Sequence, residues 1–160
     1  MILTGKDIQQ YIDKGLLKIS PVELDQFQQN GIDIFVKPPI LNLVTNEQEN
    51  IFRHGCAHLA ETRETFSIPN DLMAFVLIRS SWARKGLFPP GTVVDAGFKG
   101  TLTIELFNGG QDIKLFTDQR IVHLIFAKLT NPTKPYSGFY QNQKGITLSK
   151  YQPINHLKIQ

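Results

Sequence analysis

Two arginines and two neighbouring serines form a polar cluster in the middle of the chain: Arg79, Ser80, Ser81 and Arg84. A guanidinium group presents a planar fork of donors that matches two oxygens of a phosphate, and a serine hydroxyl can donate to the same group. The cluster follows an almost entirely apolar run, residues 72–78, which is typical of a buried strand. The sequence therefore predicts an anion site at the end of that strand.

Two carboxylates follow the cluster along the chain. Asp95 comes where a predicted strand ends in a turn, and Glu105 lies inside the next predicted strand. Because successive strand side chains alternate faces, Glu105 shares a face with Thr101 and Thr103, and the apolar side chains between them point to the core. A carboxylate on a polar face near a cationic, hydroxyl-rich loop suggests anion binding combined with acid–base chemistry.

The same residues also have structural interpretations. Arg-Ser-Ser is common in loops, and a glutamate on a strand most often lies on a solvated outer face. Trp82 and Phe88 could stack on a base, although aromatic side chains in such loops pack into the core at least as often. Asp33 is interpreted as a structural hydrogen-bond acceptor and His123, among apolar neighbours, as a structural residue with satisfied hydrogen bonds.

The composition is that of a globular protein. The 160 residues suit a single domain, residues 1–160, with 41% hydrophobic and 19% charged residues. No apolar run approaches a membrane span and the N-terminal residues lack a secretory signal, so we expect no membrane partner and a cytoplasmic location. The net charge of +3 comes from scattered cations and not from a basic stripe. A small polyanion such as a nucleoside triphosphate accounts for this charge as well as nucleic acid does, so charge alone does not decide the partner.

One cluster invites a metal interpretation: His54, Cys56 and His58. Zinc sites usually have a second ligand pair at defined spacing, and the other histidines, His123 and His156, do not supply one. A surface loop is therefore the favoured interpretation. The chain also lacks the His-x-Glu and Pro-Cys-x-x-Cys signature of zinc-dependent deaminases.

The pattern of elements indicates a mainly β domain. Thr4 and Asp7 form a capping box that starts a short N-terminal helix, and Gly15 is its expected stop. Short strands broken by Gly, Pro and Asn are expected at residues 16–19, 32–36, 65–68, 72–78, 101–107, 113–116 and 121–127. Such a series is typical of a barrel or a jelly roll.

A resemblance to a known family adds to this interpretation. The segments that carry it are Arg79-Ser80-Ser81-x-Ala83-Arg84-x-Gly86-Leu87 and Asp95-Ala96-Gly97-Phe98-Lys99-Gly100-x-Leu102-Thr103-Ile104-Glu105-Leu106. Together they resemble the signature of the dCTP deaminase family, within the dCTP deaminase/dUTPase superfamily. The resemblance implies a distorted β-barrel of the dUTPase-like type, assembled as a homotrimer with sites between subunits.

The resemblance also implies roles for individual residues. Glu105 would shuttle protons, Ser80 and Arg84 would support the attacking water and developing charge, and Asp95 would accept from the sugar 3′-hydroxyl. Arg79, Ser80 and Ser81 would hold the triphosphate, with Mg²⁺ bound through the phosphates and not by protein side chains. Further substrate-binding positions implied by the same match are Trp82, Ala83, Thr103, Ile104, Tyr136, Tyr140 and Gln143.

The last of these positions belong to the C-terminal tail. Residues 139–145 resemble the family's Lys-Tyr-x-x-Gln-x-Gly segment, which closes over bound nucleotide. Tyr140 and Gln143 match this segment, whereas Phe139 replaces its lysine. We therefore expect residues 136–160 to form a flexible lid.

Two reactions fit the resemblance: deamination of dCTP and hydrolysis of dUTP to dUMP and pyrophosphate. Arg-Ser-Ser and Glu105 favour the deaminase branch. The segment 88–92 is shorter than in bacterial deaminases and lacks their Thr-Ala pair, and such loops also occur in archaeal-type members, some of them dUTPases. Deaminase is the preferred prediction, a bifunctional enzyme and a dUTPase stay open, and an inactive nucleotide-binding homologue is the third hypothesis.

Overall fold

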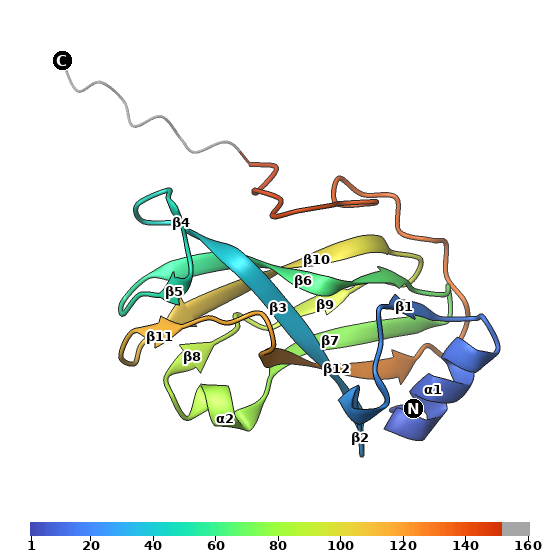
Figure 1. Cartoon of the computed structure of the whole chain (residues 1–160). Helices are drawn as coiled ribbons and strands as arrows, with labels where there is room; N and C mark the ends of the chain where they lie inside the picture. The colour runs from blue at the N-terminus through green and yellow to red at the C-terminus, as the bar shows by residue number, and fades with distance from the viewer. Residues whose placement is uncertain (152–160) are drawn as a thin grey trace.

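A curled antiparallel sheet forms most of the protein, with a short helix at one end (Figure 1). The computed structural model describes residues 1–151. The strands are β1 (Lys18–Ser20), β2 (Phe27–Gln28), β3 (Gly31–Asn42), β4 (Gln48–Glu49), β5 (Ile51–Phe52), β6 (Ala57–Ser67), β7 (Leu72–Ile78), β8 (Leu87–Phe88), β9 (Thr92–Val94), β10 (Lys99–Asn108), β11 (Ile113–Lys114) and β12 (Arg120–Lys128). The helical segments are α1 (Gly5–Asp13), the 3-10 turn η1 (Leu24–Gln26) and α2 (Ser80–Ala83).

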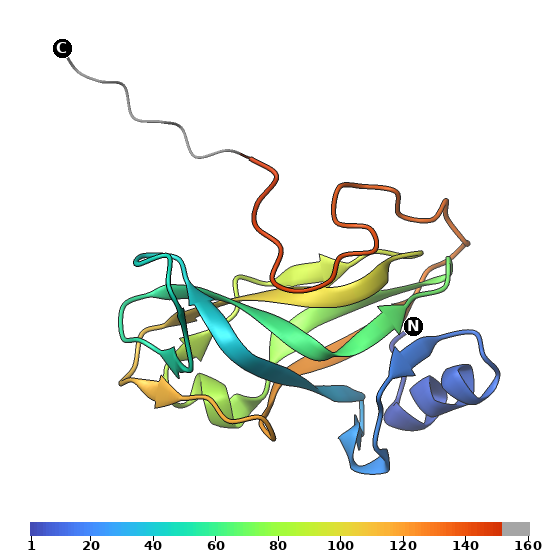
Figure 2. The same ribbon diagram turned by 45° about the horizontal axis from the view of Figure 1, so that its top comes forward.

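The main sheet runs in the order β8-β10-β6-β3-β12-β7-β9, and β1, β2 and β4 pair with its members. β5 and β11 form a separate two-stranded ribbon. The sheet curls around the core but stays open at β8 and β9, which gives a half-barrel (Figure 2). The predicted mainly β fold with a short N-terminal helix is confirmed.

Helix α1 begins where the capping box predicted. The Thr4 hydroxyl accepts from the Asp7 backbone N–H at 3.2 Å, and the Asp7 carboxylate accepts from the Thr4 N–H at 2.9 Å. Gly15 follows the helix with a φ of +68°, a left-handed conformation that favours glycine at a helix end. The predicted start and stop are therefore both confirmed.

Strand β6 is central to the sheet, although the sequence pattern did not predict its full length. It pairs with β10 on one side and β3 on the other. Its buried side chains include His58, Glu61 and Glu64, so it lacks the apolar alternation that identifies a strand. The expected surface loop for His54, Cys56 and His58 is therefore wrong for His58, which lies within β6 with its side chain fully buried.

Two other strands differ from the expectation in detail. β3 was expected at 32–36 but continues to Asn42, because a register shift between Lys37 and Leu41 accommodates the two prolines that lack an N–H. β7 has its predicted bounds but is not buried throughout: Phe75 and Leu77 are exposed on the face opposite the core. Apolar content alone does not distinguish a strand that is buried on both faces from a strand, such as β7, that is buried on one face only.

The described part of the chain contains no helix long and apolar enough to cross a membrane.

The position of α1 depends on a glycine in its first turn. A Cβ on Gly5 would lie 2.1 Å from the backbone oxygen of Gln28, at the start of the sheet. Gly5→Ala should therefore destabilise the protein by about 2 kcal/mol through overpacking, although helix propensity alone favours alanine by about 1 kcal/mol. Urea unfolding followed by circular dichroism measures this difference, with the exposed Gln10→Ala in the same helix as the control. A Gly5→Ala protein as stable as the wild type would contradict this packing.

Candidate active site

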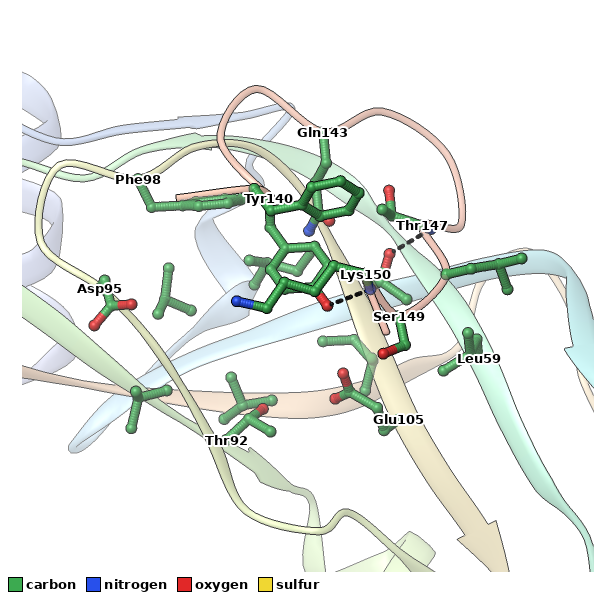
Figure 3. Close-up of a pocket in the computed structure, with 18 of the residues that line it drawn as sticks. Leu59, Thr92, Asp95, Phe98, Glu105, Tyr140, Gln143, Thr147, Ser149 and Lys150 are labelled. Atoms are coloured by element: carbon green, nitrogen blue, oxygen red, sulfur yellow. Dashed lines mark hydrogen bonds between the residues drawn. The ribbon is translucent and has the colours of Figure 1, made fainter. Parts of the chain in front are cut away.

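A cavity of about 990 Å³ lies between β10, the β9 segment and the C-terminal tail (Figure 3). The curl of the sheet explains this arrangement, because β9 and β10 lie near opposite ends of the strand order yet line the same space. The predicted site residues that line it are Asp95, Thr103, Ile104, Glu105, Tyr136, Tyr140 and Gln143. The structure thus brings together the carboxylates and the tail residues that the sequence singled out.

Strand β10 places Glu105 on the wall of this cavity. Glu105 lies opposite Leu59 of β6, whose side chain lines the same space. Burial raises the pKa of the Glu105 carboxyl above its ordinary value. A carboxyl group with a raised pKa in a partly enclosed cavity is suited to both accepting and donating a proton.

The alternation of faces along β10 holds only in part. Leu102, Ile104 and Leu106 are buried as expected, whereas Thr101 is also buried. A register shift between Thr101 and Thr103 breaks the strict alternation at this point. Thr103 and Glu105 line the cavity, together with parts of Leu102 and Ile104.

The tail lies along β10 and continues the sheet for a short distance. The Thr101 N–H donates to the Gln143 carbonyl at 3.0 Å, and the Gln143 side-chain amide donates to the Thr101 carbonyl at 2.8 Å. Thr147 donates its backbone N–H to the Thr103 hydroxyl at 3.0 Å. These contacts hold the tail against β10 as far as Thr147, and the residues up to Tyr151 line the cavity. The rest of the predicted lid, residues 152–160, lies outside the described residues.

Glu61 of β6 binds the backbone of the tail through its carboxylate. Its carboxylate accepts from the Gly145 N–H and pairs with Lys37 of β3, both at 2.6 Å. Burial raises the pKa of Glu61, but its contacts with Lys37, Thr101 and Gly145 outweigh that effect and hold the pKa below its ordinary value. An ionised acceptor under the tail is therefore part of what keeps the 143–147 segment beside Glu105.

Asp95 follows β9 directly, as predicted, in the turn that leads to β10. Its carbonyl accepts from the Phe98 N–H at 3.1 Å, and the neighbouring Gly97 has a φ of +82°. A Cβ on Gly97 would lie 2.4 Å from Pro135, so this turn packs closely against the start of the tail. The Tyr136 N–H donates to the Ala96 carbonyl at 2.8 Å, which places Tyr136 and Asp95 around the same cavity.

The arginine–serine cluster lies in a different place. Arg79, Ser81 and Trp82 line a second, smaller cavity of about 270 Å³ at the end of β7. Ser80 and Ala83 lie in α2, Arg84 follows it, and all three line neither of these two cavities. In Figure 1 α2 lies at the bottom of the view and the tail crosses its top. Within one chain the structure does not bring the cluster and Glu105 into one cavity.

The aromatic and histidine predictions have mixed outcomes. Trp82 is largely buried and its indole N–H donates to the Arg120 carbonyl at 2.8 Å, which fits the structural interpretation. Phe88 is 52% exposed in β8 and lies opposite Phe107. His123 has a satisfied contact, with its Nδ1 atom 2.9 Å from Asp33 Oδ1, as expected for a structural histidine.

Several cavity residues were missed by the sequence analysis. The first cavity also contains residues after Gly145, namely Thr147, Leu148, Ser149, Lys150 and Tyr151. The second contains Lys85, Asp118, Gln119 and Arg120. The run of hydroxyl and cationic residues in the tail could have identified part of the first group, whereas the second depends on the approach of β12 to α2.

Among residues 1–151, no group of three His, Cys, Asp or Glu side chains is arranged to hold a metal ion.

A family model described as dCTP deaminase-like matches residues 36–129 of the chain. A protein named dCTP deaminase from Sulfurisphaera tokodaii is 39% identical over 171 residues, which covers 95% of this chain and 93% of the relative. The chain belongs to the dCTP deaminase-like family. A second relative, from Sulfolobus islandicus rod-shaped virus 1, is named a probable deoxyuridine 5'-triphosphate nucleotidohydrolase. It is 41% identical over 156 residues, which cover 94% of this chain and 99% of that relative.

Solved structures agree with the family in fold. The 2'-deoxycytidine 5'-triphosphate deaminase of Agrobacterium tumefaciens has a TM-score of 0.68 at 17% identity, over 80% of this chain and 47% of that one. This chain thus spans about half the length of that deaminase. The dUTPase of Staphylococcus bacteriophage 80alpha has a TM-score of 0.55 at 15% identity, over 76% of this chain and 95% of that one.

The raised pKa of Glu105 makes stability depend on pH. In the window between 4.5, its ordinary value, and the raised pKa, the folded protein keeps a proton that the unfolded chain releases. The free energy of unfolding should therefore fall as pH rises through this window. Glu105→Gln does not ionise, so it should gain stability over the wild type above the window and not below it.

Urea unfolding of both proteins at about pH 4 and about pH 8 measures this gain. Glu64, whose pKa burial also raises, is unchanged in both proteins and cancels in the comparison. The exposed Glu47→Gln serves as the control. A difference between Glu105→Gln and wild type that is the same at both pH values would contradict the burial of an ionisable Glu105.

Proposed function

We propose that this protein is a pyrimidine deoxynucleotide hydrolase that deaminates dCTP to dUTP and ammonia. The observation that carries the proposal is the half-buried carboxyl of Glu105 in a cavity that also contains Asp95 and the tail. Membership of the dCTP deaminase-like family supports it, as do relatives named dCTP deaminase that match nearly the whole chain. The proposed unit is a single domain whose tail acts as the lid.

The chemistry requires Glu105 to move two protons. Water adds to C4 of cytosine, and Glu105 takes a proton from this water and passes it to ring N3. Glu105 then takes the proton of the new C4 hydroxyl and gives it to the amino group, and ammonia departs as the C4 carbonyl forms. Burial raises the pKa of the Glu105 carboxyl, so that it holds a proton more readily than an exposed glutamate does, which suits it to pass protons in both directions.

Substrate contacts are assigned from the same cavity. Asp95 accepts from the sugar 3′-hydroxyl, Gln143 reads the base, and Tyr136 and Tyr140 close over the nucleotide. Thr103 and Ile104 lie beside Glu105 on β10 and support the pyrimidine. Figure 3 shows Asp95, Glu105, Tyr140 and Gln143 around one space, which a nucleoside would fill.

The phosphate contacts come from a second copy of the chain. Arg79, Ser81 and Trp82 line a separate cavity, so a nucleotide held by Glu105 meets them only across a subunit boundary. In this arrangement Ser80 and Arg84 of the neighbouring subunit approach the attacking water, and Ala83 supports the phosphate loop. A homotrimer with sites between subunits satisfies these requirements.

Magnesium is assigned to the nucleotide. The described residues contain no acidic or histidine cluster that suits a resident ion, but Arg79 and Ser81 offer donors for phosphate oxygens, which fits an ion carried by the triphosphate. When bound to the phosphates, Mg²⁺ would neutralise part of their charge. Arg79 and Ser81 would hold phosphate oxygens by donating to them.

Hydrolysis of dUTP is the second candidate function. The relative from Sulfolobus islandicus rod-shaped virus 1, at 41% identity, carries the name of that activity. In this reaction Asp95 would activate the water that attacks the α-phosphorus, and the products would be dUMP and pyrophosphate. One protein could perform both reactions in sequence. An inactive nucleotide-binding homologue is disfavoured because both Glu105 and Asp95 are present.

Separate incubations with dCTP and dUTP in the presence of Mg²⁺ test the proposal, with ammonia, dUTP, dUMP and pyrophosphate resolved. We expect ammonia release from dCTP. Glu105→Gln should lose this activity by about 10²- to 10⁴-fold while it still binds dCTP, and the exposed Glu47→Gln is the matched control. Pyrophosphate release from dUTP without ammonia release from dCTP would replace the deaminase by the dUTPase. Undiminished ammonia release by Glu105→Gln would remove Glu105 from its role.

A further inference from the structure

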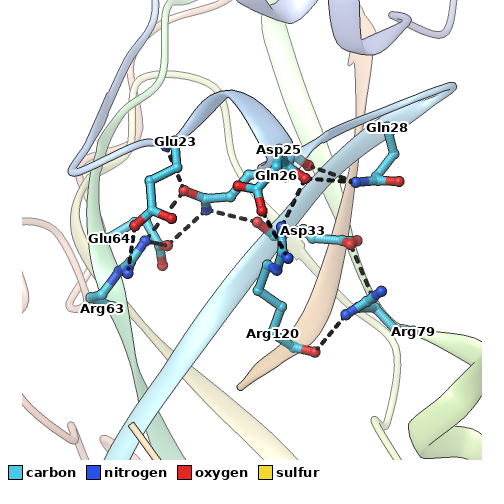
Figure 4. Close-up of polar contacts among 9 residues, drawn as sticks. All are labelled: Glu23, Asp25, Gln26, Gln28, Asp33, Arg63, Glu64, Arg79 and Arg120. Carbon is cyan, nitrogen blue, oxygen red and sulfur yellow. Dashed lines mark hydrogen bonds and ion pairs between the residues drawn. The ribbon is translucent and has the colours of Figure 1, made fainter. Parts of the chain in front are cut away.

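The buried carboxylate of Asp33 contacts the side chain of Arg79. The side chain of Asp33 is 3% exposed, and its Oδ2 atom lies 2.9 Å from Arg79 Nε. Its other oxygen lies 2.9 Å from His123 Nδ1. Figure 4 shows Asp33 between the polar contacts of η1 and the Arg79 side chain. Each oxygen of this carboxylate therefore contacts a side-chain nitrogen: one from Arg79, just after β7, and one from His123 in β12.

The strand order builds this contact. Asp33 of β3 lies directly opposite His123 of β12, and β12 pairs on its other side with β7, which ends just before Arg79. The Arg79 N–H donates to the Ile121 carbonyl at 2.9 Å, so the backbone of Arg79 is fixed to β12 as well. Three adjacent strands thus set the relative positions of the carboxylate, the imidazole and the guanidinium group.

The contact uses one edge of the guanidinium group and leaves another available. A guanidinium group has five N–H donors in a rigid fork. Asp33 takes the Nε edge, and Nη1 donates to the Arg120 carbonyl at 3.3 Å. Arg79 is 39% exposed and lines the second cavity, so the remaining donors are available there to an anion.

The imidazole of His123 is also restrained. A Cβ on Gly31 would lie 2.7 Å from His123 Nε2 and 2.4 Å from the Leu124 carbonyl, so this glycine gives the ring its space. The ring therefore packs against the β3 backbone with Nδ1 toward Asp33. When Nδ1 carries a proton, it donates to Asp33 and holds the carboxylate in place for Arg79.

A neighbouring buried carboxylate provides a contrast. Glu64 is fully buried and accepts from the Gln26 side chain at 2.9 Å and from the Phe35 N–H at 3.2 Å. Its contacts stay within β3, β6 and η1, and it does not contact Arg79. Of these two buried acids, only Asp33 contacts a residue that lines the second cavity.

We propose that Asp33 and His123 are positioning residues, which hold Arg79 in the orientation that binds the phosphate chain of the substrate. The inference rests on the proposed function for the role of that phosphate chain. Asp33 fixes the guanidinium plane, and His123 fixes Asp33. The ligand class for the fixed Arg79 is a triphosphate.

Binding of inorganic tripolyphosphate, measured by calorimetry with Mg²⁺ present, tests this proposal on the full chain. Asp33→Asn and His123→Leu should each weaken binding by about tenfold, because they remove a hydrogen bond to a charged group. His123→Gln, whose amide N–H can still donate to Asp33, should bind within about twofold of the wild type. Glu64→Gln, a change of a buried acid that does not contact Arg79, is the matched control and should bind as the wild type does.

Kinetics with the converted nucleotide add a second readout. The two weakened variants should raise KM for the triphosphate more than they lower kcat, and His123→Gln should restore KM. A merely structural role would lower the melting temperature of Asp33→Asn and Glu64→Gln alike without this selective rise. If Asp33→Asn does not fold, the comparison of His123→Leu with His123→Gln, at a partly exposed residue, decides the question.

The proposal is overturned if Asp33→Asn or His123→Leu folds and binds tripolyphosphate as tightly as the wild type. It is equally overturned if Arg79→Ala does so. Tripolyphosphate has no base or sugar, so this result is separate from the proposed function. A wild type that binds tripolyphosphate but converts neither dCTP nor dUTP would refute the proposed function and leave the positioning role supported by the variants.

Discussion

The burial of one carboxyl group is the constraint on which the proposed site depends. Glu105 lies on a strand that is hydrogen-bonded to β6 on one side, and that strand's first residues pair with the tail. Without the tail the cavity would open to water on that side, and the burial that raises the pKa of Glu105 would be reduced. In the proposed mechanism the tail therefore has two roles: it closes the cavity, and it keeps the Glu105 carboxyl buried.

The curl of the sheet explains both what the cavity contains and what it lacks. β9 and β10 lie near opposite ends of the strand order, and the curl brings Asp95 and Glu105 around one space. Arg79 follows the end of β7 and lines another cavity, together with residues of β12 and the segment before it. Two motif segments that lie close together in the sequence are thus placed on two surfaces of the chain. We propose that assembly of several copies joins them.

The sequence predicted the elements whose side chains follow a simple rule. Strands β7 and β12 came from apolar runs, and α1 came from the capping box of Thr4 and Asp7. Strand β6 had no such rule, because its buried polar residues are stabilised by partners from distant segments, such as Lys37 for Glu61. The sequence of this strand therefore resembles that of a surface loop.

The sequence predicted candidate site residues but not how they lie relative to one another. The motif indicated Glu105 and Arg79, and the structure places both beside cavities. Their separation depends on the curl of the sheet and on which strand end each one occupies, and neither follows from local spacing. The same holds for the contact of Asp33 with Arg79, which joins residues of β3 and the end of β7 through β12.

The central claim is that Glu105 and the arginine–serine cluster act together across two copies of the chain. Mixing two inactive variants, Glu105→Gln and Arg84→Ala, after joint unfolding and refolding tests it most directly. If sites form between subunits, the mixture should recover about a quarter of wild-type ammonia release, because some sites then combine one intact surface from each variant. A mixture that stays as inactive as either variant alone, with both assembled normally, would contradict the account.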